Sequence, residues 1–538
     1  MTLIYFIVFY NLIYFFGKTI TLNLLKSRNV EEIFCEYKIN TFYPLISFFF
    51  IGNLANILNF ILPIKNLIFF LPIIFITKIN KLFVGESIKE LLLTNFLFPA
   101  VLGVSIYGIG FHYDAGLYHL NHQNWLRESN IILGLTNIYF PYGWSSIVEY
   151  INGVLIISEN YIFLHFVNLV FLNQFFVFLF NGIKTGKNSF IKKICILILI
   201  FGFLDNFGFD GGRNGFIYIQ AVGKFDNVFA TVFTIFNILI FNQIFMGKFE
   251  AKDLSLLTFL ALFSFQIKYT GGLALALLFY YIIKFNNLKT SKLNSILIPY
   301  YSLFCLWLLK NLLSSGCFIF GIEVTCLENL SWYQNGLSNK AIQDTRNFNL
   351  AYFFDKNIHE WFIIWINKRI NYVVFINFLI SILLIIIFTF LFNKFKIKNS
   401  KILNFYILIN LIIWILGAPD PRFGSGMFIL FLFPIAYYIE EDRTLFNFIF
   451  KNNKIFYFLL LVCLSLLPRI DSYINYINNY KLNIFLALPY VEYQESKNWG
   501  VKPIESDQCW VNLDCTKFNV SIIEKKYFIF NSFIVKDQ

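Results

Sequence analysis

Residues 111–146 read FHYDAGLYHLNHQNWLRESNIILGLTNIYFPYGWSS, a polar and aromatic segment in a chain that is otherwise mostly apolar. The segment contains three of the five histidines of the chain. Read as a helix, it places the histidines on one stripe and aligns four other side chains on a second stripe: Asp114, Tyr118, Asn121 and Trp125. Two apolar helices can be connected without such a segment, so we expect it to form the main part of an active site at a membrane surface.

The segment interrupts a series of apolar runs that indicates a multi-pass membrane protein. Of the 538 residues, 58% are hydrophobic and only 14% are charged, and the mean hydropathy is +0.65. Runs near the ~20 residues needed to cross a bilayer recur at 2–23, 41–61, 62–77, 90–110, 160–182, 191–204, 226–246, 254–267, 272–284, 294–313, 369–393, 402–417, 425–439 and 453–468. Because several runs are short enough to be tilted or partial, we predict an all-α polytopic fold of about 12–14 transmembrane helices.

The positive charge of the chain lies mainly in short lysine-rich loops. The formal net charge is +12, but basic and aromatic residues are not interleaved as in a nucleic-acid groove, so we predict no nucleic-acid partner. Lysine-rich loops are expected to face the cytoplasm, and they lie at 184–193, 248–252, 284–292, 394–401 and 443–454. The segments then expected on the extracytoplasmic side are 111–145, 205–225, 268–271, 314–368, 418–424 and 469–538. We therefore divide the chain into a transmembrane domain, 1–468, and an extracytoplasmic tail, 469–538.

The eight cysteines follow the same division. Four lie in or near apolar runs and are expected to be small apolar fillers: Cys35, Cys195, Cys305 and Cys463. The other four form two closely spaced pairs on the predicted extracytoplasmic side, where disulfides are permitted: Cys317 with Cys326, and Cys509 with Cys515. We treat both pairs as disulfide candidates.

Three charged residues near the ends of apolar runs are candidates for chemistry. Asp114 and Asp226 are predicted catalytic carboxylates at the boundary between water and lipid, able to take a proton from a hydroxyl group. Either could instead cap or favour the start of a helix. Lys268 lies between two short apolar runs, where a lysine is costly unless it pairs with an anion such as a phosphate. The alternative for Lys268 is a side chain that extends to the water at the interface.

The stretch APDPRFG at 418–424 predicts a rigid, exposed reversal between two apolar runs, because prolines and glycines dominate it. It presents Asp420 and Arg422 together near the membrane. An arginine fork suits a phosphate group, so we expect both residues to bind substrate. The alternative is a pair that only holds the loop together.

The histidines and aromatic residues of the first outer loop are predicted to bind a substrate that carries hydroxyl groups. His119 and His122 have a spacing that could bind a metal, but no third ligand is evident, so hydrogen bonds to a hydroxylated substrate are favoured. Tyr118 and Trp125 could stack on a sugar, although aromatic anchoring at the interface is equally ordinary.

Several short motifs together resemble those of an uncharacterised family of bacterial multi-pass membrane proteins. The motifs are YDAGLYH at 113–119, W-x-x-E at 125–128, GLTN at 134–137, SSG at 314–316, APDPRFG at 418–424 and QCW…C at 508–515. That family in turn resembles the GT-C glycosyltransferases, which include protein mannosyltransferases and lipid A aminoarabinose transferases. The first resemblance covers nearly the whole chain, and the second is architectural.

The GT-C resemblance implies an enzyme of the bacterial inner membrane that moves a sugar from a polyprenyl-phosphate donor. The acceptor would be an envelope glycan, lipid or protein on the outer face. The resemblance assigns the catalytic acidic residue of the first outer loop to Asp114 and a second acidic residue to Asp226. Lys268 and Arg422 would hold the lipid phosphate. Ala115 follows Asp114, so the paired acidic motif of better-known members is absent, which leaves a divalent metal cofactor open.

Two other functions stay open at this point. A glycan polymerase or ligase would act on the same face, and the length of its product would distinguish it. A transporter or flippase for polyprenyl-linked glycans would not be an enzyme. Transporters tend to show internal repeats and broken helices near the midplane, whereas this sequence shows no repeat and its polar residues cluster at one face.

Overall fold

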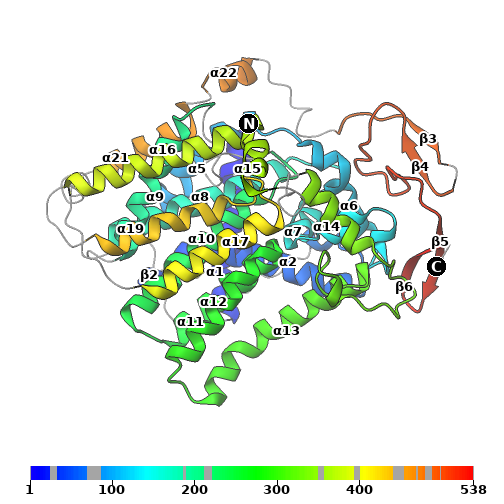
Figure 1. The fold of residues 1–538 in the computed structure, drawn as a ribbon, viewed down its shortest axis with the longest axis horizontal. Helices are drawn as coiled ribbons and strands as arrows, with labels where there is room; N and C mark the ends of the chain where they lie inside the picture. Colours follow the sequence, from blue (N-terminus) through cyan, green and yellow to red (C-terminus); the bar gives the residue numbers. More distant parts are fainter. Residues whose placement is uncertain are drawn as a thin grey trace.

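The computed structural model is mainly a bundle of long helices, with a small region of strands at the C-terminal end (Figure 1). It describes residues 2–24, 33–69, 87–185, 190–210, 221–348, 357–392, 400–439, 454–467, 470–478, 488–496 and 498–536. The helices of the first half are α1 (Thr2–Leu24), α2 (Tyr43–Asn59), α4 (Ile88–Leu91), the π-helix η4 (Leu92–Leu97), α5 (Phe98–Gly103), α6 (Leu120–Glu128), α7 (Ile147–Leu155), α8 (Leu164–Thr185), α9 (Phe190–Asn206), α10 (Asp226–Met246) and α11 (Ala251–Ile267). Those of the second half are α12 (Gly272–Phe285), α13 (Thr290–Ser315), α14 (Leu337–Phe348), α15 (Ile358–Asn367), α16 (Arg369–Phe392), α17 (Lys401–Gly417), α18 (Ser425–Phe428), α19 (Leu432–Tyr438), α21 (Lys454–Ser465) and α22 (Ile470–Asn478).

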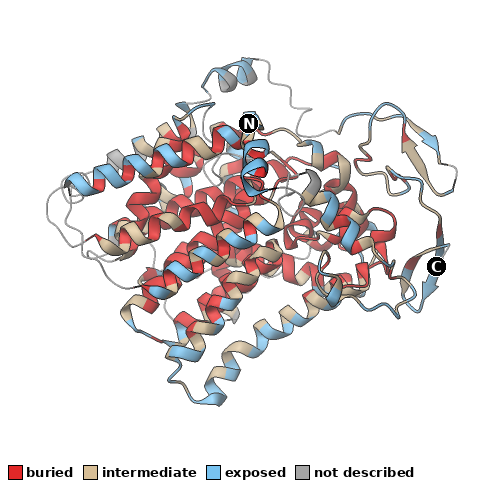
Figure 2. Cartoon of the chain, in the orientation of Figure 1, coloured by how far each residue is buried: buried red, intermediate tan, exposed pale blue. Residues whose placement is uncertain are grey.

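Within the described residues, seven helical spans are long and apolar enough to cross a membrane. They are Thr2–Asn23, Ile39–Asn59, Ile88–Gly108, Leu164–Lys184, Asp226–Met246, Thr290–Ser315 and Arg369–Leu391. The α8 and α10 helices lie in the buried centre of the bundle, whereas α13 and α16 lie at its periphery and are more exposed (Figure 2). Leu383 and Leu391 on α16 and Leu408 on α17 are exposed, and an extended apolar outer surface indicates contact with lipid. The prediction of a largely α-helical, multi-pass membrane protein is confirmed.

Two of the predicted apolar runs depart from a continuous helix in their described residues. Residues 62–69 form turns and the short 3-10 helix Leu67–Phe69, and the rest of the run 62–77 lies outside the described residues. The run 425–439 is divided into α18, a 3-10 turn and α19. Pro434 lies in the first turn of α19, where the missing N–H of proline prevents a continuous α-helical ladder from α18.

Helix ends that adjoin lysine-rich loops are joined by two hydrogen bonds. Lys193 Nζ on α9 donates a hydrogen bond to the Ile439 carbonyl after α19, at 2.8 Å. Tyr281 OH on α12 donates to the Lys248 carbonyl after α10, at 2.6 Å. The end of α9 therefore meets that of α19, and the end of α10 meets that of α12. Phe245 of α10 also stacks on Tyr437 of α19, with ring centres 4.1 Å apart.

The C-terminal tail packs against the polar segment 111–146. Its described residues form two antiparallel hairpins, β3 (Tyr493–Glu495) with β4 (Val501–Pro503), and β5 (Ile522–Tyr527) with β6 (Phe530–Val535). A further pair, β1 (Ile33–Phe34) with β2 (Tyr37–Lys38), follows α1. Leu133 N donates to Asn531 O at 2.8 Å, and Phe533 N donates to Leu133 O at 2.9 Å. The strands and this contact were not predicted from the sequence.

Candidate active site

A backbone contact holds the start of the polar segment beside the loop that precedes α10. His112 N donates to Val222 O at 2.9 Å. The next residue, Gly223, has φ +88°, and a Cβ there would lie 2.8 Å from the Cβ of Ala115, so a glycine is required for this approach. Ala115 is fully buried in the contact. A second acidic side chain at position 115 would have no space, which explains why Asp114 stands without an acidic neighbour.

This contact places Asp114 beside Lys224, whose Nζ donates to Asp114 Oδ2 at 2.6 Å. His112 Nδ1 lies 3.4 Å from the same oxygen, but it also accepts the backbone N–H of Asp114 at 3.1 Å. Lys224 Nζ is the closer of the two partners of this oxygen. Burial opposes ionisation of Asp114, yet the His112 ring and the Lys224 ammonium outweigh it and hold the pKa of this carboxyl well below its usual range.

Asp226 and Lys268 form a second ion pair. Asp226 is the first residue of α10, where the helix N-terminus favours a carboxylate. Lys268 directly follows the last residue of α11. The two helices are neighbours, and Lys268 Nζ donates to Asp226 Oδ1 at 2.8 Å. The lysine that sequence analysis expected to need an anion therefore has one.

The loop between α17 and α18 holds Asp420 and Arg422 as a forked pair. Arg422 Nε and Nη2 donate to Asp420 Oδ1 and Oδ2 at 3.1 and 3.2 Å. Indole N–H groups fix the loop from both sides, because Trp414 donates to Asp420 O at 2.8 Å and Trp365 donates to Pro419 O at 2.7 Å. The guanidinium is thereby held at a fixed position next to the membrane-spanning helices.

These ion pairs lie together. Lys268 Nζ is 3.9 Å from the centre of the Phe423 ring, in the loop that carries Arg422. Burial and the nearby charge of Arg422 lower the pKa of Lys224, while the Asp114 and Asp226 carboxylates act in the opposite direction. Loops that are far apart in the sequence thus contribute to one charged cluster, which we call the ion-pair cluster.

Each pair of the ion-pair cluster has one partly exposed and one buried member. The exposed members, with their exposed side-chain fractions, are Asp114 (26%), Lys268 (26%) and Arg422 (28%). The buried partners are Lys224 (9%), Asp226 (8%) and Asp420 (8%). A substrate would therefore meet one carboxylate and two cations, held in place by partners behind them. Asp226, which was predicted to be catalytic, is one of these buried partners and holds Lys268 in place.

The predicted stripe through the polar segment is broken by a π-helical turn. Ala115–His119 form this turn, η6, and Leu120 N donates to Ala115 O before α6 begins. The wider turn adds a residue and shifts the register of the side chains. As a result, Asp114 faces Lys224, whereas Asn121 donates to the Asn512 carbonyl in the tail.

Tyr118 and His119 remain beside the ion-pair cluster. Burial and the charges of Asp114, Glu149 and Asp226 raise the pKa of Tyr118, so its hydroxyl keeps its proton at neutral pH. The His119 ring centre lies 4.1 Å from that of Tyr118 and 4.8 Å from that of Phe225, the residue before Asp226.

Trp125 lies in an apolar cluster that joins α6 to the tail. Its side chain is only 8% exposed and makes an edge contact with Phe533 of β6, with ring centres 5.6 Å apart. Ile132 and Ile522 belong to the same cluster. Since the indole face is covered, the structure gives Trp125 a packing role and does not support the predicted stacking on a sugar.

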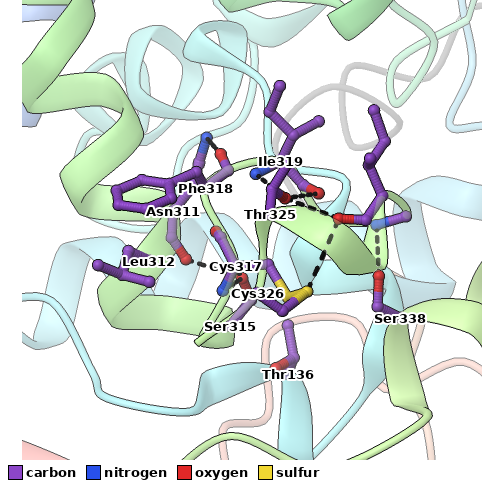
Figure 3. The surroundings of a disulfide bond; sticks show 12 residues. Thr136, Asn311, Leu312, Ser315, Cys317, Phe318, Ile319, Thr325, Cys326 and Ser338 are labelled. Carbon is purple, nitrogen blue, oxygen red and sulfur yellow. Dashed lines mark hydrogen bonds between the residues drawn. A yellow bond between two sulfur atoms is a disulfide. The ribbon is translucent and has the colours of Figure 1, made fainter. Parts of the chain in front are cut away.

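The disulfide between Cys317 and Cys326 closes a turn that follows α13 (Figure 3). Thr136 of the polar segment donates to Ser314 O at 3.4 Å, and Gly321 N donates to the Ser338 hydroxyl at 2.8 Å. The turn thus connects the polar segment with α14.

The disulfide between Cys509 and Cys515 closes a loop of the tail over the residues that follow Asp114. Trp510 N donates to Gly116 O at 2.8 Å, and a Cβ on Gly116 would lie 2.7 Å from the Trp510 ring. Only glycine permits this approach. The tail therefore forms an outer wall beside the ion-pair cluster.

In the part of the chain that the structure describes, no group of three or more His, Cys, Asp or Glu residues could hold a metal ion. A cavity of about 800 Å³ opens between α1, η4 and α8, with mostly apolar lining and with Lys89, Glu90 and Lys184 at its polar positions. It lies at the lysine-rich end of the bundle, away from the ion-pair cluster, so it is not part of the candidate site.

Sequence reasoning missed three residues of this region. Lys224 was not predicted as a site residue, yet it is the partner of Asp114. Glu149 on α7 and Lys310 on α13 are buried, at 2% and 1% exposure. Both are isolated charges in apolar stretches, and that pattern was a usable signal of a functional or paired residue.

Comparison with known proteins identifies the family of the chain. Residues 1–429 match the family model described as "Domain of unknown function (DUF8201)". No curated protein matched the chain, and no solved structure did. Since the family model covers most of its length, the chain belongs to the DUF8201 family.

Proposed function

We propose that the protein is a glycosyltransferase of the bacterial inner membrane that transfers a sugar from a polyprenyl-phosphate donor to an acceptor hydroxyl at the extracytoplasmic face. The observation that carries this proposal is the exposed side of the ion-pair cluster, with Asp114 beside Lys268 and Arg422. One carboxylate and two cations at the end of a membrane bundle match a reaction between a neutral hydroxyl and a lipid-linked phosphate. The GT-C resemblance of the motifs supports the same reaction class.

The proposed reaction is a single displacement with inversion at the anomeric carbon. The acceptor oxygen bonds to that carbon as the bond from the carbon to the phosphate oxygen breaks. The acceptor proton passes to Asp114, and the leaving polyprenyl phosphate gains charge beside Lys268 and Arg422, where cations stabilise it most. Because its pKa is lowered, Asp114 is a weak base, so its proton transfer occurs late, when the acceptor oxygen has begun to bond.

Arg422 has free donors for this task. A guanidinium carries five N–H donors, and Asp420 engages those of Nε and one of Nη2. The donors on Nη1 are left for a phosphate oxygen. A charged hydrogen bond of this kind contributes about 1.5–3 kcal/mol, equal to about tenfold to a hundredfold in affinity.

The test is the binding of a short-chain polyprenyl phosphate without sugar to the purified protein. We expect Arg422→Ala to weaken binding by about tenfold to a hundredfold, and Arg422→Lys to recover only part of it because a point charge cannot reproduce the fork. Arg369→Ala is the matched control, since Arg369 pairs with Asp210 at 3.0 Å but is 84% exposed. Equal binding by wild type and Arg422→Ala would contradict the proposal.

A further inference from the structure

Behind the ion-pair cluster lies a buried carboxylate that the proposed reaction does not yet use. Glu149 lies in the first turn of α7, which Ser146 caps, and it is 2% exposed. Its Oε1 atom is hydrogen-bonded to His119 Nδ1, and its Oε2 atom accepts from Gln123 Nε2 at 2.6 Å. A buried carboxylate with both oxygens engaged is a strong acceptor of hydrogen bonds.

The contact with Glu149 determines which nitrogen of His119 carries the proton. An ionised carboxylate can only accept, so Nδ1 of His119 must donate. In the neutral ring, Nε2 then has a lone pair and no hydrogen. Nε2 is thus an acceptor, which suits a hydroxyl group and disfavours the oxygen atoms of a phosphate.

The His119 ring lies beside the candidate site. The His119 side chain is 10% exposed, whereas that of Glu149 is 3% exposed. Nδ1 is engaged by the buried Glu149, so Nε2 is the ring nitrogen that is left for a ligand. The ring packs on Phe225, between Lys224 and Asp226 of the ion-pair cluster.

Several charged groups surround the pair formed by Glu149 and His119. Asp114 and Tyr118 lie on the same helical segment, Lys224 and Asp226 flank Phe225, and Lys310 on α13 acts on both Glu149 and His122. Burial and the Lys310 charge lower the pKa of His122, so His122 stays neutral at physiological pH. Its ring is buried and stacks on Tyr142, with ring centres 5.4 Å apart.

We infer that His119 Nε2 accepts a hydrogen bond from a hydroxyl group of the sugar substrate, and that Glu149 is the positioning residue that fixes the ring and its tautomer for this contact. The inference rests on the proposed function for the identity of the substrate. It divides the site into a phosphate half, formed by Lys268 and Arg422, and a hydroxyl half, formed by Asp114 and His119. Substitution of Glu149 should therefore affect the hydroxyl half alone.

The first measurement is the tautomer of His119, independent of any substrate. Protein with ¹⁵N-labelled histidine is placed in lipid nanodiscs, and the His119→Asn variant identifies the His119 signals. We expect the neutral ring of wild type to carry its proton on Nδ1 and none on Nε2. Glu149→Gln should give a mixture of tautomers, because a carboxamide can donate as well as accept. Glu149→Asp should keep the wild-type tautomer. Protonation of Nε2 in wild type, or no change in Glu149→Gln, would overturn the inference.

The second measurement separates this inference from the proposed function. Release of sugar from a short-chain polyprenyl-phosphate hexose is followed beside binding of the sugar-free polyprenyl phosphate. Glu149→Gln should lower sugar release at least tenfold and leave phosphate binding unchanged, and Glu149→Asp should recover part of the rate. Asn152→Ala, on the same buried helix, is the control and should retain activity. A parallel loss of phosphate binding in Glu149→Gln would show a general structural role and reject the inference. Failure of wild type to bind the phosphate at all would reject the proposed function instead.

Discussion

Asp226 and Asp253 occupy equivalent positions at opposite ends of the bundle, since each lies in the first turn of one of two consecutive, neighbouring helices. Asp253 accepts from Cys35 N at 2.8 Å and from Gln243 Nε2 at 3.1 Å. Asp253 and both partners are at most 4% exposed. Asp226 is buried as well, but its partner Lys268 is 26% exposed.

The two aspartates differ in their surroundings: Asp253 is enclosed by other buried groups, whereas Asp226 adjoins the candidate site. Both carboxylate oxygens of Asp253 accept hydrogen bonds from neutral, buried donors, so a ligand has no access to them. Asp226 instead holds a cation whose remaining donors reach a polar, partly exposed space. The exposure of the partner, and not the burial of the carboxylate, therefore indicates where the candidate site lies.

The largest expected effect is a difference in thiol labelling between the two ends of the bundle, which we predict to lie on opposite sides of the membrane. Tyr490 precedes β3 and is 88% exposed, whereas Asn287 is exposed in the loop between α12 and α13 at the lysine-rich end. In intact cells, a membrane-impermeant thiol reagent should label Tyr490→Cys and leave Asn287→Cys unlabelled, an all-or-none difference. Permeabilised cells, in which both should react, are the control. Labelling of Asn287→Cys alone would invert the topology and place the ion-pair cluster in the cytoplasm.

The second prediction compares the effect on transfer of replacing the partly exposed Asp114 with that of replacing the buried Asp253. Asp114→Asn keeps the shape of the side chain and removes the proton acceptor, so transfer should fall by about 10²–10⁴, with donor binding nearly unchanged. Asp253→Asn should lower the thermal stability but leave transfer per folded molecule near the wild-type value. The measurement is product formation by purified, folded variants. Near-normal transfer by Asp114→Asn would show that the carboxylate is not the proton acceptor.

The smallest effect concerns the wall that the tail forms. In Gly116→Ala, the added Cβ would lie 2.7 Å from the Trp510 ring, and such overpacking costs about 1–3 kcal/mol. We expect a lower melting temperature and faster proteolysis of the tail. Gly110→Ala is the control, because a Cβ there meets nothing within 4 Å. Identical protease sensitivity of the two variants would mean that the tail does not depend on this contact.

Much of the fold was readable from the sequence because its signals are local. Apolar runs near the length of a bilayer crossing predicted the long helices, and the lysines of alternate loops grouped Asp114, Lys268 and Arg422 at one end. The pairing of Asp114 with Lys224 was not predictable, because it joins residues 110 positions apart through helix packing that has no local signal. The π-turn at Ala115–His119 was also hidden, since helical periodicity assumes an unchanged register.

The strands of the tail and their packing against the polar segment were missed for a related reason. Its strands are only three to six residues long, and their partners in the polar segment lie near the other end of the chain. Short strands are stabilised by such distant contacts more than by their own sequence. The contact of Trp125 with Phe533 could not be predicted for the same reason, because Phe533 lies on β6.

The contact between Gln508 and Tyr113 also imposes an order on biogenesis. Gln508 Nε2 donates to Tyr113 O at 2.9 Å across 395 positions of sequence. At ~5–20 residues per second, translation takes about 20–80 s to pass from one partner to the other. During this interval, the segment that carries Asp114 has been synthesised without the wall that later encloses it. A chain that ended between residues 488 and 508 would therefore keep all the described helices and still lack the contacts that the tail makes with residues 113–116.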